Sequence, residues 1–393
     1  MSGDAQYERV SLALGHYEDT GVLKEVYHQP AAAADTRQRI NLAATYYRPR
    51  RPSRTVTVFM HPISSLAHLP LIEELAAAGH HIVCCPTRYA NDPALIMEKA
   101  LTDLGGCIRH LKENLGYEKV VLGGWSGGGS LMAFYQSQAE NPTITHTPAG
   151  DPYDLTHAGL TPADGVMLLA AHASRHQMFT EWIDASVLDE HNPDIRDRDL
   201  DLYAPDATHQ PPYAAEFVER YRAAQIARNR RITTWVKAKL QHLRDTGRPH
   251  EEFGFVVHGT MADPRWLDPA LDPNGRRPNW CYMGDPRMVN NGPTGLARFT
   301  TLRSWLSQWS YDDARGSGPT CVGDVTKPVL VVGMDGDDCC PPSHTRALYE
   351  GIKHSEKEVH FIAGVDHYVR GRPEGLIETR DLCGKWLETH DLR

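Results

Sequence analysis

The sequence lacks several features that would identify whole classes of protein. It contains no run of 18 uninterrupted apolar residues, so no membrane-spanning helix and no membrane partner are expected. Its net charge is −9, with acidic and basic residues interspersed, which disfavours nucleic acid as a partner. Its first ten residues, MSGDAQYERV, lack the basic-then-apolar layout of a secretory signal. We therefore expect a cytoplasmic protein.

The cysteines and glycines also lack the spacings that bind metals or nucleotides. Eight cysteines lie at positions 84, 85, 107, 281, 321, 339, 340 and 383, with adjacent pairs and irregular gaps. This spacing fits neither a disulfide framework nor a zinc site, so we expect buried, reduced thiols and no metal. The phosphate-binding pattern G-x-x-x-x-G-K-[ST] and the dinucleotide pattern G-x-G-x-x-G do not support a nucleotide site here. The sequence therefore predicts no cofactor.

What the sequence does contain is an alternation of short apolar runs and helical patterns. Strands are predicted within residues 40–49, 55–62, 80–89, 118–126 and 164–172, and helices within 69–79, 92–115 and 128–140. The alternation resumes with strands within 327–338 and 357–364 and helices within 343–353 and 374–390. This order is typical of an α/β protein with a mostly parallel sheet flanked by helices.

The alternation is interrupted between residues 174 and 325. This stretch is dominated by helical and loop signals and holds six of the eight tryptophans. A sheet pattern that stops and is later completed indicates an insertion rather than a second independent domain. We therefore predict a core formed by residues 1–173 and 326–393, with a mainly helical cap, residues 174–325, inserted before the penultimate core strand.

A glycine-rich segment surrounds Ser126 in the sequence VVLGGWSGGGS. Gly124 to Gly128 fit the pattern G-x-S-x-G, and they lie between a predicted strand and a predicted helix. In such a turn the flanking residues must be small, because the strand and helix backbones approach closely. The following helix directs its first amides at the site, where negative charge would develop. The segment predicts a nucleophilic serine; the alternative is a glycine-rich connector.

A nucleophilic serine needs a base, and the base needs an acid to orient it. In this architecture both follow later strands, in the order serine, acid, histidine. His367 comes just after the last predicted strand. The preceding strand ends in MDGDDCCPP, which offers Asp335, Asp337 and Asp338 as candidate acids.

With these three positions the chain resembles the α/β-hydrolase superfamily over residues 40–174 and 325–390. Many members place the acid four residues before a proline, and Asp337 stands four before Pro341, so the resemblance favours Asp337 over Asp338. Asp366, next to the histidine, is expected to cap its own loop. Aspartate-nucleophile dehalogenases and epoxide hydrolases are disfavoured, because a serine occupies the turn.

The resemblance also implies an oxyanion hole made of two backbone N–H groups. Gly127, directly after the serine, would supply one of them. The second would come from the loop after the strand at 55–60, where members usually carry His-Gly and this chain carries His61-Pro62. Because proline has no N–H, Ile63 is the expected donor, with Ser64 as the second choice.

These features together predict a serine hydrolase that cleaves a carboxylic ester or lactone of a small molecule through an acyl-enzyme. The tryptophans favour a bulky or aromatic substrate group, and Trp125, Trp280, Trp305 and Trp309 are the candidate contacts. Three alternatives stay open: a carbon–carbon bond hydrolase of a diketone-like substrate, an acyltransferase with the same triad, and a non-enzymatic binding protein. Assembly into a homo-oligomer is also left open.

Overall fold

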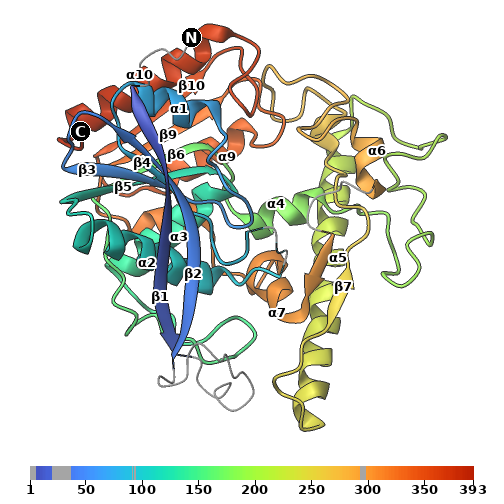
Figure 1. The fold of residues 1–393 in the computed structure, drawn as a ribbon. Helices are drawn as coiled ribbons and strands as arrows, with labels where there is room; N and C mark the ends of the chain where they lie inside the picture. Colours follow the sequence, from blue (N-terminus) through green and yellow to red (C-terminus); the bar gives the residue numbers. More distant parts are fainter. Residues whose placement is uncertain (1–5, 20–36, 91, 93, 293–297) are drawn as a thin grey trace.

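A single eight-stranded sheet forms the centre of the molecule, with the strand order β1-β2-β4-β3-β5-β6-β9-β10 (Figure 1). The structure, a computed structural model, describes residues 6–19, 37–90, 92, 94–292 and 298–393. The strands are β1 (Tyr7–Asp19), β2 (Arg37–Pro49), β3 (Thr55–Phe59), β4 (Ile82–Cys84), β5 (Lys119–Ser126), β6 (Gly165–Ala171), β9 (Val329–Met334) and β10 (Lys357–Ile362). From β4 to β10 every neighbouring pair is parallel, which confirms the predicted mostly parallel sheet.

The two antiparallel strands β1 and β2 lie at one edge of the sheet. The sequence analysis did not predict β1, because few of its side chains are buried and its apolar pattern is weak. By contrast, β6 and β9 are apolar and buried along their whole length, as expected for strands covered on both faces. The recognisable strands are therefore those that helices cover on both sides.

Helices cover the sheet on both faces (Figure 1). On one face, α2 (Met97–Glu113), α3 (Gly127–Glu140) and α9 (Pro342–Gly351) contribute to one large apolar cluster. On the other face, α1 (Pro70–Ala77) packs with α10 (Pro373–Thr389) over a second cluster. This three-layer arrangement leaves the carboxyl ends of the parallel strands together at one edge, where ligands bind in open α/β sheets.

Residues 174–325, hereafter the insertion, lie between β6 and β9. Most of the insertion forms the second body in Figure 1, beside the sheet, whereas its last residues pack on the core, where Cys321, Val322 and Val325 belong to the large apolar cluster. Its elements are α4 (Arg175–Trp182), α5 (Ala215–Asp245), β7 (Gly254–Val256), η3 (Pro264–Trp266), α6 (Pro286–Asn291), β8 (Phe299–Thr301), α7 (Leu302–Ser304), η4 (Trp305–Trp309), α8 (Gly318–Cys321) and η5 (Val322–Asp324). The short strands β7 and β8 pair with each other in a separate two-stranded sheet. None of the insertion's described residues adds a strand to the main sheet.

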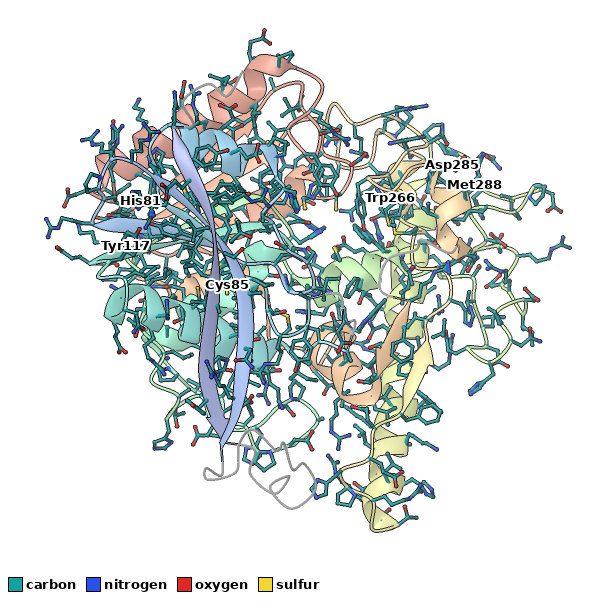
Figure 2. All side chains as sticks on the ribbon, viewed as in Figure 1. His81, Cys85, Tyr117, Trp266, Asp285 and Met288 are labelled. Carbon is teal, nitrogen blue, oxygen red and sulfur yellow. The ribbon has the colours of Figure 1, made fainter. Side chains whose placement is uncertain are left out.

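The insertion has apolar clusters of its own and also contacts the core. The Gly318 N–H donates to the Ala173 carbonyl at 2.8 Å, and the Met97 N–H donates to Ser307 Oγ at 2.8 Å. Figure 2 shows Trp266 on the side of the insertion that faces the sheet, whereas Met288 lies farther out and is 72% exposed. Among the described helices, none is both long enough and apolar enough to cross a membrane.

Candidate active site

Ser126 occupies the turn between β5 and α3 in a backbone conformation that few side-chain-bearing residues adopt. Its φ is 53° and its ψ is −123°. A non-glycine residue with positive φ costs energy, and such strain is found where the surrounding structure fixes a functional side chain. The turn therefore has the geometry expected of a nucleophile between a strand and a helix.

The glycines around Ser126 are required by close packing. A Cβ on Gly124 would lie 2.7 Å from the Cα of Gly129, and a Cβ on Gly128 would lie 2.5 Å from the Met60 carbonyl oxygen. Real Cβ atoms essentially never approach other non-bonded atoms this closely. The glycine cluster thus lets the strand, the helix and the loop after β3 meet at the serine, rather than serving as a flexible connector.

Asp337 and His367 are brought together by the loops that follow β9 and β10. His367 Nδ1 lies 2.9 Å from Asp337 Oδ2 and 3.1 Å from Oδ1, and both side chains are buried. Asp337 Oδ1 also accepts the backbone N–H groups of Cys339 and Cys340, at 2.7 Å each. These bonds hold the carboxylate in place, and its bond to Nδ1 fixes the orientation of the imidazole.

The neighbouring acids face elsewhere. The carboxylate of Asp366 accepts the N–H groups of Tyr368 and Arg370, both at 2.9 Å, so it closes its own loop. Asp338 is half-buried next to Asp337, and burial followed by the charge of Asp337 raises its pKa to about 7. Of the three candidate acids after β9, only Asp337 has a hydrogen bond to His367 among the described residues.

The predicted nucleophile and base open into one cavity of about 350 Å³. Its lining residues are His61, Ile63, Ser64, Ser65, Leu66, Leu69, Trp125, Ser126, Gly127, His172, Arg175, Met178, Trp182, Tyr282, Cys339, His367 and Tyr368. They come from the loops after β3, β6, β9 and β10, from the junction of β5 and α3, and from the insertion. The cavity thus joins the carboxyl edge of the sheet to the inserted segment.

The two predicted oxyanion donors, Gly127 and Ile63, both line this cavity. The Ile63 N–H, however, lies 3.4 Å from Nδ1 of His61, and Ser64 Oγ lies 2.8 Å from the same nitrogen. Because an N–H group can only donate, Nδ1 accepts, and the neutral ring then carries its proton on Nε2. Burial, followed by the charge of Arg175, lowers the pKa of His61 to about 3, so the ring is neutral.

His61 Nε2 is therefore a hydrogen-bond donor that faces the predicted oxyanion site. A Cβ on Gly127 would lie 3.0 Å from this nitrogen. The sequence analysis used His61-Pro62 only for the proline that replaces the usual glycine, and the His61 side chain was not predicted to take part. The strand β3 is the sequence signal that could have identified His61, because His61 stands two residues after the end of this strand, at the carboxyl edge of the sheet.

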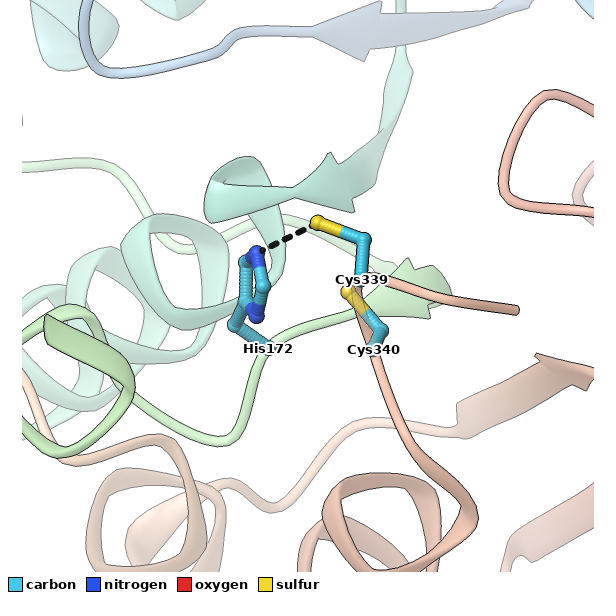
Figure 3. Close-up of side chains that lie close together, drawn as sticks. All are labelled: His172, Cys339 and Cys340. Carbon is cyan, nitrogen blue, oxygen red and sulfur yellow. Dashed lines mark hydrogen bonds between the residues drawn. The ribbon is translucent and has the colours of Figure 1, made fainter. Parts of the chain in front are cut away.

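A buried thiol lies beside the predicted triad. Cys339 Sγ is 3.4 Å from His172 Nε2, and the adjacent Cys340 lies alongside (Figure 3). Burial disfavours the thiolate, but the contact with Cys340 and the charges of His367 and His172 hold the pKa of Cys339 well below that of a free thiol. No spacing rule pointed to this cluster, because His172 comes from the loop after β6.

The same side chains could hold a thiophilic metal ion. Ligand atoms of His172, Cys339 and Cys340 lie within 4.8 Å of one another, as do those of Asp337, Cys340 and His367. The mixed sulfur and imidazole donors suit zinc or a similar ion. An ion on the second set would occupy the acid and the base of the predicted triad, so a bound metal would oppose serine chemistry rather than assist it.

Three of the four predicted tryptophan contacts lie away from the cavity. Trp125 lines it, next to the nucleophile, with its ring 6.0 Å from that of His367. Trp305 and Trp309 are fully buried and stack on each other at 5.2 Å in the apolar core of the insertion. Trp280 is half-buried under the guanidinium of Arg277. The aromatic wall consists instead of Trp125, Trp182, Tyr282 and Tyr368.

The insertion also binds the loop that carries the acid. Trp266 Nε1 donates to the Asp338 carbonyl at 2.6 Å, and Asn274 Nδ2 donates to the Asp337 carbonyl at 2.8 Å. The Gly275 N–H donates to the Asp335 carbonyl at 2.7 Å. Three backbone carbonyls of the acid loop are therefore bound by groups of the insertion.

Comparisons with known proteins give distant structural likenesses only. No protein-family model matches the chain, and no curated protein matches its sequence. Similar solved structures include a monoacylglycerol lipase from Paleococcus ferrophilus, with a TM-score of 0.46 and 16% identity over 89% of this chain and 100% of the other. Est1E from Butyrivibrio proteoclasticus has a TM-score of 0.46 and 12% identity over 97% and 100%. The esterase domain of a Rhodothermus marinus protein has a TM-score of 0.46 and 11% identity over 97% and 98%.

The fold follows from the chain's own geometry rather than from these likenesses. Five neighbouring strand pairs are parallel, a strained serine joins the buried strand β5 to α3, and an acid and a histidine follow the last two strands. Strand order and these three positions give the chain the fold of the α/β-hydrolase superfamily.

Proposed function

We propose that the protein is a serine hydrolase that cleaves carboxylic esters through an acyl-enzyme. The observation that carries this proposal is the buried Asp337–His367 pair, which opens into the same cavity as the strained Ser126. This combination of a presented hydroxyl, an oriented imidazole and a fixed carboxylate is the arrangement that activates a serine.

In the proposed reaction, His367 Nε2 takes the proton of Ser126 as Oγ attacks the ester carbonyl. The tetrahedral oxyanion is stabilised by the Gly127 N–H and by the Nε2–H of His61. The Ile63 N–H, which points at His61 Nδ1, would turn towards the oxyanion and add a third hydrogen bond. His367 then gives the proton to the leaving alcohol. Water repeats the sequence on the acyl-enzyme and releases the acid, with Asp337 holding the imidazole throughout.

The protonation state of His367 sets the pH range of this mechanism. Burial alone would lower its pKa, but the carboxylate of Asp337 and the thiol of Cys339 outweigh burial and raise the pKa well above the usual 6.5. A protonated imidazole cannot act as a base. We therefore expect activity to be lost as the pH falls through this raised pKa, and the acid limb of the pH profile to lie above pH 6.5.

The cavity supports a small substrate with an apolar or aromatic portion. Its volume of about 350 Å³ is within the range of small-molecule sites. Trp182 and Tyr282 of the insertion form part of the wall, which supports a role for the insertion as a cap. An ester or a lactone would both suit this site. The apolar rings fit bulky groups by contact rather than by hydrogen bonding.

The proposal is tested by the Ser126→Ala variant. We expect the purified protein to hydrolyse members of a panel of esters and lactones and to be labelled by an organophosphonate, whereas the variant should lose both, with a fall in turnover of about a million-fold. Retained labelling in the variant would show that Ser126 is not the nucleophile. Turnover of diketones alone would identify a carbon–carbon bond hydrolase, and transfer to an alcohol without hydrolysis would identify an acyltransferase.

A further inference from the structure

Arg175, the first residue of α4, is a buried cation that the proposed mechanism does not use. Its side chain lies in the loop region directly after β6, and the residue is 4% exposed. Nε and Nη2 donate to Gln308 Oε1 at 3.1 and 2.8 Å, and the guanidinium stacks on Phe179 at 4.7 Å from the ring centroid. These contacts fix the plane and direction of the guanidinium.

No carboxylate among the described residues neutralises Arg175. Burial lowers its pKa to about 10, which still leaves it charged at neutral pH. Other buried arginines of the insertion are matched: Arg228 pairs with Glu190 at 2.6 Å, and Arg276 donates to four backbone carbonyls. The hydrogen-bond acceptor of Arg175 among the described residues is one neutral amide oxygen, that of Gln308. Burying a charge with so little compensation is costly, and such groups concentrate at functional sites.

The unused nitrogen of Arg175 faces the predicted oxyanion site. Nη1 has no acceptor among the described residues, and the side chain lines the cavity. A Cβ on Gly127 would lie 3.1 Å from this nitrogen, so it is next to the backbone that follows the nucleophile. An acceptor bound to Nη1 would therefore lie within a few atoms of the carbonyl that Ser126 attacks.

We propose that Arg175 binds a carboxylate of the substrate, so that the preferred esters are monoesters of dicarboxylic acids. This inference rests on the proposed function and names its substrate class. A carboxylate would supply the missing negative charge and accept a charge-assisted hydrogen bond from Nη1. The neighbouring ring of His61 is neutral, so it adds no second positive charge beside Arg175.

The test compares two isosteric esters, monobenzyl succinate and benzyl succinamate, which differ only in carboxylate against carboxamide. We expect the wild-type kcat/KM to favour the carboxylate by about 30-fold or more, the range of a hydrogen bond to a charged group. Arg175→Met should reduce this ratio to near one, and Arg175→Lys should keep part of it. Arg230→Met removes an exposed arginine on α5 and should leave the ratio as in the wild type.

Two outcomes would overturn the inference. If the wild type shows no preference, the substrate carboxylate is not recognised. If Arg175→Met lowers both rates together and keeps the ratio, Arg175 serves the oxyanion or the fold rather than a carboxylate.

A binding measurement separates this inference from the proposed function. Succinate and glutarate should raise the thermal unfolding temperature of the wild type and of Ser126→Ala, but not that of Arg175→Met. Stabilisation that is independent of Arg175 contradicts the inference. Stabilisation that depends on Arg175, in a protein that hydrolyses no ester, would support the carboxylate site and refute the esterase.

Discussion

The interior of the insertion and the wall of the cavity bury their charged side chains in opposite ways. Within the insertion, away from the cavity, charges neutralise one another: Arg228 pairs with Glu190, and Arg265 lies between Glu181 and Asp263. At the cavity, Asp337 faces a histidine, and the only hydrogen-bond acceptor of Arg175 among the described residues is an amide. The first group of charges is matched by carboxylates, whereas the charge of Arg175 is left for a ligand to neutralise.

The largest expected effect comes from changing the acid of the predicted triad. Asp337→Asn should lower turnover by about ten-thousand-fold, because asparagine leaves the histidine in the wrong tautomer. Asp338→Asn is the matched control, since Asp338 is adjacent in sequence and makes no hydrogen bond to His367 among the described residues. Steady-state kinetics of both variants decide the assignment. A larger loss in Asp338→Asn would place the acid one residue further along.

Two tryptophans of the insertion test its two roles, Trp305 in the insertion's own core and Trp182 in the wall of the cavity. Trp305→Ala should lower the free energy of unfolding by about 3–5 kcal/mol, because this ring is fully buried in the insertion's core. Its preference among esters should stay that of the wild type. Urea unfolding and a panel of acyl groups measure the two effects. A changed preference without loss of stability would return Trp305 to the cavity.

Trp182→Ala should change the preference among esters, since Trp182 lines the cavity. Removing an apolar wall typically shifts discrimination by about 1–3 kcal/mol between substrates that do and do not contact it. Relative kcat/KM values for large and small acyl groups provide the measurement, and labelling by a small phosphonate is the control for intact chemistry. Uniform loss across all substrates would mean that the ring only supports the fold.

The smallest expected effect concerns the thiol beside the base. Cys339→Ala removes a group that helps to raise the pKa of His367, so the acid limb of the kcat/KM profile should move to lower pH. Because the protonated imidazole is inactive, the variant should be relatively more active than the wild type on the acid side. Cys383→Ala, a buried thiol on α10, is the control. An unmoved or upward-shifted limb would contradict the contribution of Cys339.

Much of the core could be predicted from the sequence, because its signals are local. Covered strands are continuous apolar runs, and β5, the glycine turn and α3 follow one another within 22 residues, from Lys119 to Glu140. Ser126, Asp337 and His367 could be predicted as candidates because each stands at the end of a recognisable strand or shortly after one. β1 was not found, since an edge strand with few buried residues leaves a weak pattern.

The rest of the site depends on contacts between distant segments. His172 and Arg175 follow β6, and they reach the cavity beside Ser126 because β6 lies next to β5 in the sheet. Trp305 and Trp309 were candidate contacts, but they pack inward against α4 and each other, which their sequence does not indicate. An inserted body must bury an apolar core of its own, and its largest rings were used for that purpose.

Hydrogen bonds between the insertion and the acid loop tie the position of the cavity wall to the position of the acid. Trp266, Asn274 and Gly275 bind the carbonyls of residues 335, 337 and 338, which are the backbone from which the acid projects. Lifting the insertion away from the sheet would break these bonds and free the acid loop at the same moment.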